Sequence, residues 1–148
     1  MSDMRDLYQE LIIDHGRNPR NFGDIPTANR CNEGFNPLCG DKIKIYILEK
    51  DNKIEDIKFK GEGCAISVAS ASLMTQALKG KSIKEAENLF HDFHEVVTGK
   101  ATGEENLGKL SALSGVAEYP VRVKCATLCW HTLLAALHNK HEIVSTEE

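Results

Sequence analysis

A β-hairpin is encoded by residues 41–60, which read DKIKIYILEK (41–50), DNK (51–53) and IEDIKFK (54–60). Ile43, Ile45 and Ile47 alternate with polar side chains, which is the pattern of a half-buried strand. Ile57 and Phe59 fall on one face of the following segment and predict a second strand. The short polar turn between the two segments joins them as an antiparallel pair.

The hairpin leads directly into a helix of small residues. Residues 61–65 read GEGCA, where the glycines break the strand, and a helix is predicted from about residue 65 to residue 78. The first half of this helix carries the small side chains Ser67, Ala69, Ser70, Ala71 and Ser72. We therefore expect another element to pack very close to its backbone.

The region before the hairpin is predicted to hold one helix and a long loop. Leu7 and Leu11 recur at helical spacing and predict a helix over residues 3–15, with Gly16 just past its end. The stretch 17–40 is rich in proline, asparagine and glycine, so it is predicted to be mostly loop with one short edge strand.

Two longer helices and a short one are predicted after the hairpin and its helix. Ser82 and Glu85 form a capping box that starts a helix reaching about residue 97. A short helix is predicted at 107–113, and a last amphipathic helix runs from about residue 121 to residue 139.

The sequence shows no internal repeat and no domain boundary. We predict a single domain over residues 1–148, with a mobile tail from about residue 142. Helices and strands that segregate along the chain define an α+β fold. Its expected form is a small antiparallel sheet of about three strands packed against a cluster of helices.

Composition and charge exclude several classes of protein. The chain has 148 residues, of which 41% are hydrophobic and 27% charged, as in an ordinary globular domain. The formal net charge of −4 argues against nucleic-acid binding. No apolar run approaches the roughly 18 residues of a membrane span, and the first residues lack the layout of a signal peptide. We therefore expect a cytoplasmic protein with neither a nucleic-acid nor a membrane partner.

The chain contains an odd number of cysteines, which are Cys31, Cys39, Cys64, Cys125 and Cys129. Disulfides are rare in a reducing compartment, so metal binding or thiol chemistry is the better interpretation.

Two of these cysteines lie where one element is predicted to give way to the next. Cys39 and Asp41 flank Gly40 at a loop-to-strand corner, and Gly40 permits the tight backbone that lets a thiol and a carboxylate converge on one ion. Cys64 lies at a helix N-terminus, where the exposed amides and the helix dipole favour the thiolate.

A third cysteine, Cys125, follows Arg122 and Lys124, and both cations favour its thiolate form. Three thiolates and one carboxylate would make a tetrahedral zinc site of net charge −2, which Arg122, Lys124 and Lys42 could offset. The spacing matches no zinc-finger pattern, so three unrelated buried cysteines remain an open alternative on the residues alone.

Several motifs resemble the IscU/NifU N-terminal-domain family of iron–sulfur cluster assembly proteins. They are NPLCGD (36–41), FKGEGCAISVASAS (59–72), KCATL (124–128), and LYQELIIDH (7–15) followed by NPRN (18–21). The resemblance runs from about residue 7 to residue 139. It implies the fold of that family and a role in building iron–sulfur clusters.

Within this family the chain is similar to the SufU branch. The segment between Cys64 and Cys125 is longer than in the scaffold branch, and Lys124 stands where that branch usually has histidine. In scaffolds that histidine is a candidate ligand of the cluster or of a metal ion. A lysine cannot easily take over this ligand role at neutral pH. The substitution therefore counts against a stable cluster.

The resemblance implies a sulfur-transfer chemistry and a set of site residues. SufU-type proteins take persulfide sulfur from a cysteine desulfurase of the SufS type and pass it to a separate scaffold complex. They hold Zn²⁺ through the positions that match Cys39, Asp41, Cys64 and Cys125. Cys39 is then the expected acceptor thiol, with Cys125 as the second candidate, and Lys124 and Arg122 support the persulfide or the partner.

Two alternatives to sulfur transfer remain open. The protein could be a scaffold that builds and hands on a 2Fe–2S cluster, because soft thiolates bind zinc and iron–sulfur centres alike. It could also be a structural zinc module whose metal supports folding alone. Whether sulfur transfer would be enzymatic turnover in its own right is also open.

The remaining candidate residues have ordinary interpretations. Cys31 is predicted to be a loop thiol without a role, and Cys129 a small core residue. His91 and His94 are spaced one helical turn apart, which is typical of a solvated helix face. His15 ends the first helix, where a capping or partner-contact role is expected.

Overall fold

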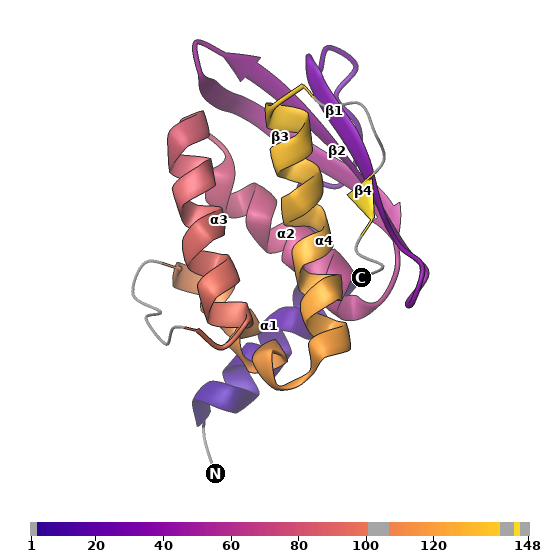
Figure 1. Cartoon of the computed structure of the whole chain (residues 1–148), viewed down its shortest axis with the longest axis vertical. Helices are drawn as coiled ribbons and strands as arrows, with labels where there is room; N and C mark the ends of the chain where they lie inside the picture. The colour runs from indigo at the N-terminus through magenta and orange to yellow at the C-terminus, as the bar shows by residue number, and fades with distance from the viewer. Residues whose placement is uncertain (1–2, 101–106, 140–143, 146–148) are drawn as a thin grey trace.

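The computed structural model describes residues 3–100, 107–139 and 144–145, with side chains from residue 8 onward. In chain order the elements are α1 (Asp3–Arg17), β1 (Arg30–Asn36), β2 (Asp41–Lys50), β3 (Lys53–Glu62), α2 (Ala65–Leu78), α3 (Ile83–Val97), the 3₁₀ helix η1 (Gly108–Glu118), α4 (Pro120–Leu137) and β4 (Val144–Ser145). Figure 1 shows the helices gathered against one face of the sheet, so the predicted α+β architecture is confirmed.

The sheet has the strand order β3-β2-β1-β4 and is antiparallel except where β4 joins β1. The predicted hairpin is present as β2 and β3. Its turn residues Asp51 and Asn52 have φ angles of 54° and 64°, the left-handed geometry that matches the twist of a tight hairpin. Ile43, Ile45 and Ile47 are buried beneath the helices, as their alternation predicted.

The sheet differs from the prediction on its β1 side. Over the described residues it has four strands rather than about three. β1 lies inside the sheet because β4 pairs beside it, Gly34 with Val144 and Phe35 with Ser145. The tail predicted to be mobile from about residue 142 includes these two positions, where the backbone pairs with β1. The rest of that tail, 142–143 and 146–148, lies outside the described residues.

Helix α1 continues past its predicted end. Gly16 lies within α1 and packs against the start of α2, because a Cβ added there would lie 3.4 Å from the Cβ of Ala65, an ordinary van der Waals distance. His15 is buried, and its Nδ1 lies 2.6 Å from Ser72 Oγ. The predicted capping or partner-contact role of His15 is therefore wrong, because its side chain is bonded inside the molecule. Burial lowers the pKa of this imidazole.

The small residues of α2 pack against α4, as expected. Ser67, Ser70 and Ser72 are buried, and Ser70 Oγ donates a hydrogen bond of 2.6 Å to the carbonyl of Ala126 in α4. Cys129 is buried beside Ser70, which confirms it as a core residue. The prediction that α4 is amphipathic is wrong over its second half, because the sheet, α2, α3 and η1 all pack around it.

The predicted short helix at 107–113 is present as the 3₁₀ helix η1, which extends to Glu118. Among the described residues, no helix is both long enough and apolar enough to cross a membrane.

Candidate metal centre

Three of the predicted ligands lie close together, although they come from different elements of the fold. Cys39 lies in the β1–β2 connection, Asp41 begins β2, and Cys125 lies in the second turn of α4. Their ligand atoms, two Sγ and one carboxylate oxygen, all lie within 4.8 Å of one another. The Cys39 and Cys125 sulfurs are 3.3 Å apart. Residues distant in the sequence therefore converge on one point, as the zinc hypothesis requires.

The Asp41 carboxylate is fully buried and held by backbone and side-chain donors. Its Oδ1 accepts a hydrogen bond of 2.9 Å from the backbone N–H of Cys64. The Asn36 amide lies 3.5 Å from Asp41 Oδ2 and 3.7 Å from Cys125 Sγ, so it bridges two of the candidate ligands. A Cβ at Gly63 would collide with the same carboxylate, so this position requires glycine.

Cys64 is the N-cap residue of α2, and its Sγ accepts a hydrogen bond of 3.4 Å from the Ser67 N–H. It borders the same cavity as Cys39 and Cys125. Its ligand atom does not fall within the 4.8 Å of the other three, so the structure shows a trio of ligand atoms with the fourth candidate beside it. We call these four residues, Cys39, Asp41, Cys64 and Cys125, the thiol centre.

The cluster of thiols and a carboxylate at the thiol centre favours the binding of a cation. Burial raises the pKa of the Cys125 thiol, and the neighbouring Cys39, Asp41 and Cys64 side chains raise it further. A cation placed among these donors would reverse that preference and favour the thiolates. Three sulfurs and one carboxylate oxygen are a donor set that zinc accepts in tetrahedral geometry. The residues present therefore fit a zinc ion.

The thiols of the centre differ in access. Cys125 is 2% exposed and sits under the corner, whereas Cys39 is exposed on its loop. Gly40, with a φ of 71°, allows that loop its tight turn, and Leu38 beside it is 59% exposed. A protein partner can therefore reach Cys39 far more easily than Cys125.

A cavity of about 1120 Å³ opens beside the thiols, between α1 and the η1–α4 junction. Ile13, Tyr119 and Val121 line it and are each about half exposed, so its rim is apolar. Arg122 also lines it, with its guanidinium 5.6 Å from the Tyr119 ring centre. Sequence reasoning missed this rim. Two large apolar residues at the start of the last predicted helix, Tyr119 and Val121, were the signal in the sequence that could have indicated it.

The two predicted supporting cations are separated. Arg122 shares the cavity of the thiols, but Lys124 lines a different cavity that also contains His94 and His131. The prediction of a solvated face holds for His91, which is exposed, and fails for His94, because Phe90 and His131 pack against it. Cys31 lies on β1 rather than in the predicted loop, and its side chain is exposed.

Comparison with known proteins places the chain in a family. Residues 7–126 match the family described as NifU-like N terminal domain. The chain belongs to this family. The resemblance carried by its sequence motifs is thereby confirmed.

Relatives of the chain bear names for two related roles. It is 44% identical over 128 residues to the zinc-dependent sulfurtransferase SufU of Bacillus subtilis, covering 86% of each chain. It is 40% identical to the iron–sulfur cluster assembly scaffold protein IscU of Streptococcus pyogenes, covering 93% of this chain and 86% of the relative. A crystal structure of a candidate scaffold for the SUF system from Fervidobacterium islandicum superposes with a TM-score of 0.83 at 38% identity, covering 90% of this chain and 98% of that one. The family is one of iron–sulfur cluster assembly, and its members divide by name between sulfur transfer and scaffolding.

Proposed function

We propose that this protein is a zinc-bound sulfur acceptor. It takes persulfide sulfur from a cysteine desulfurase of the SufS type and passes it to a separate cluster-building scaffold in the cytoplasm. The observation that carries the proposal is the exposed Cys39 thiol directly beside the buried Asp41 and Cys125. Zinc bound by the thiol centre would supply the positive charge that keeps these sulfurs as thiolates.

The transfer step balances without any oxidant or reductant. The Cys39 thiolate attacks the outer sulfur of the desulfurase persulfide and forms a new S–S bond. The original S–S bond breaks, and the desulfurase cysteine leaves as a thiolate. Cys39 then carries the persulfide, and a thiolate of the receiving protein removes its outer sulfur by the same exchange.

The surroundings of Cys39 suit the docking of a protein partner. Leu38 and the apolar rim formed by Ile13, Tyr119 and Val121 expose hydrophobic surface on the same side as the thiol. Arg122 lies in this cavity and would stabilise the negative charge of a persulfide. Lys124 is in another cavity, so the proposal assigns it no contact with the transferred sulfur.

The scaffold alternative is supported by the 40% identity to the Streptococcus pyogenes protein named as a scaffold. Protein ligands of a 2Fe–2S cluster are cysteines, with histidine in some centres. The thiol centre instead has three cysteines and one aspartate, and a lysine precedes Cys125. The cysteines suit zinc and iron–sulfur centres alike. What favours zinc, and hence the sulfur acceptor, is Lys124 in the place where the scaffold branch usually has a histidine.

The deciding experiment measures cysteine turnover by a cognate desulfurase in the presence of the zinc-loaded, iron-free protein. We expect strong stimulation by the wild type, loss of stimulation with Cys39→Ala, and full stimulation with the control Cys31→Ala, which removes an exposed thiol on β1. Mass spectrometry of the wild type should find one added sulfur atom on Cys39.

Two readouts separate the alternatives. Zinc content and the melting curve of Cys39→Ala show whether lost stimulation reflects a lost acceptor or a lost metal, and added sulfur on Cys125 would move the acceptor to that thiol. No stimulation by the zinc form, together with assembly of a coloured cluster once iron and sulfide are supplied, would identify a scaffold instead.

A further inference from the structure

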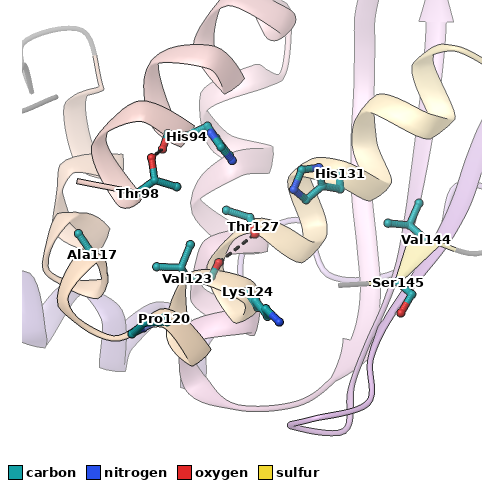
Figure 2. A pocket seen from close by; sticks show the side chains of 10 residues that line it. All are labelled: His94, Thr98, Ala117, Pro120, Val123, Lys124, Thr127, His131, Val144 and Ser145. Carbon is teal, nitrogen blue, oxygen red and sulfur yellow. Dashed lines mark hydrogen bonds between the residues drawn. The ribbon is translucent and has the colours of Figure 1, made fainter. Parts of the chain in front are cut away.

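A second cavity lies against α4, away from the apolar rim of the thiol centre. It has a volume of about 570 Å³ and is bordered by α3, the end of η1, α4 and β4. Two of its lining residues are histidines, His94 from α3 and His131 from α4 (Figure 2). No aspartate or glutamate is among the described residues that line it. We call it the histidine cavity.

The two imidazoles lie next to one another, with their ring planes nearly perpendicular. Their ring centres are 6.1 Å apart with an interplanar angle of 74°. Phe90 packs edge-on against both rings, at 5.6 Å from His94 and 5.2 Å from His131, and itself stacks on the buried Trp130. Figure 2 shows each ring with a nitrogen on the side of the other ring. Aromatic packing therefore fixes both side chains in this arrangement.

The separation of the rings suits a shared metal ion. A metal–nitrogen bond of about 2.0–2.1 Å places the centres of two imidazoles on one ion roughly 5 to 6.5 Å apart, depending on the angle between the bonds. The observed 6.1 Å lies in the upper part of that range.

We propose that His94 and His131 form a second metal site, one that binds a divalent transition-metal ion through two imidazoles. Imidazole suits zinc, nickel, iron and copper. Among the described residues, no third histidine, cysteine, aspartate or glutamate joins the pair, so water completes the coordination. The site is therefore weaker and more easily exchanged than the thiol centre, and it is independent of the proposed sulfur transfer.

The surroundings of the pair agree with this assignment. Burial lowers the pKa of His131, and His94 lowers it further, so this imidazole is neutral, as a metal ligand must be, at neutral pH. Lys124 also lines the cavity, but Figure 2 shows its amine directed away from the two rings. His131 follows Cys125 by six positions on α4, which is about 9 Å along the helix axis, so the two metal sites are near but separate.

The test is a calorimetric titration with Ni²⁺ of the protein loaded with one equivalent of zinc, which fills the tighter thiol centre and leaves the histidine pair open. We expect one further equivalent of Ni²⁺ to bind to the wild type. His94→Phe and His131→Phe keep an aromatic ring against Phe90 but remove the ligand, so each should weaken Ni²⁺ binding by at least about 10- to 100-fold. The control His91→Phe changes an exposed histidine on the same helix and should bind as the wild type does.

A measurement on the unmutated protein keeps the proposal testable if a variant fails to fold. Paramagnetic Ni²⁺ should broaden the imidazole NMR signals of His94 and His131 first. Three results would overturn the proposal: no binding of Ni²⁺ to the wild type that holds one equivalent of zinc, unchanged binding in both folded phenylalanine variants, or broadening confined to the exposed histidines. Because this experiment measures nickel binding, a negative result would not affect the proposal of sulfur transfer. A negative result in the desulfurase experiment would likewise not affect the proposed histidine site.

Discussion

The thiol centre and the histidine cavity both use α4, but their side chains are held by different forces. At the thiol centre, Asp41 and Cys125 are buried among polar groups, with hydrogen bonds from the Cys64 backbone and the Asn36 amide. In the histidine cavity, aromatic packing positions two imidazoles. Removing the metal ion from the thiol centre would leave buried groups whose charge is unfavourable. Removing it from the histidine cavity would leave two imidazoles that aromatic packing still holds. Metal binding should therefore be coupled to folding at the thiol centre and much less so in the histidine cavity.

The largest effect is expected from Cys125→Ala. This variant should lose zinc, and with it the zinc-linked stability, about 4 kcal/mol when free zinc exceeds Kd about a thousandfold. Zinc analysis and chemical unfolding with and without a chelator measure both quantities. His131→Phe should keep the full chelator effect. If Cys125→Ala retained zinc and the wild-type stability, the coupling that distinguishes the two regions would not exist.

A smaller effect is expected from Gly63→Ala. The added methyl group would collide with the Asp41 carboxylate at a φ of +155°, so we expect destabilisation of about 1–3 kcal/mol and a lower affinity for zinc. Gly80→Ala is the matched control, because Gly80 also has a positive φ, +86°, but no atom lies within 4 Å of the added Cβ. Competition with a chelator should show weaker zinc binding for Gly63→Ala alone. Equal zinc affinity in both variants would mean that the position of Asp41 does not matter to the metal.

The smallest effect concerns the pH dependence of stability in the histidine cavity. The pKa of His131 is lowered on folding, chiefly by burial, so the unfolded chain binds protons more readily. The stability that this imidazole contributes is present above its ordinary pKa of 6.5 and is lost as pH falls through the folded value. Each unit of lowering corresponds to about 1.4 kcal/mol.

The measurement compares unfolding of the wild type and His131→Phe between pH 7.5 and pH 5, which is about one unit above and about one and a half units below the pKa of free histidine. As the pH falls, the wild type should lose more of its free energy of unfolding than His131→Phe does. Taking the difference cancels protonation at the thiol centre, which is common to both. A difference that stays constant with pH would show that His131 titrates as in the unfolded chain.

Much of the fold could be predicted from local patterns. The hairpin follows from alternation and a short turn, and α3 follows from the capping box of Ser82 and Glu85, which is present in the structure. The end of α1 and the place of β1 could not be predicted in this way. Gly16 is used for a contact with α2, and β1 becomes an inner strand because Val144, far along the chain, pairs beside it.

The candidate site residues were likewise predictable only where local sequence signals mark them. Cys39, Asp41 and Cys64 lie at boundaries between elements marked by local signals, and Cys125 follows two cations. The family motifs then allowed the four residues to be named together from the sequence. The histidine pair could not, because His94 and His131 lie on separate helices, His94 in the last turn of α3 and His131 within α4. No spacing within one helix reveals a partner on another.

The sequence by itself determined which side chains could bind a metal and which backbone corners carry them, because thiol chemistry, glycine geometry and helix capping are local properties. The tertiary structure alone decided that Cys39, Asp41 and Cys125 converge, that His15 is buried, and that Lys124 faces another cavity than Arg122. These outcomes depend on how each helix is rotated about its own axis. That rotation is set by packing against the sheet and the neighbouring helices, which no local pattern contains.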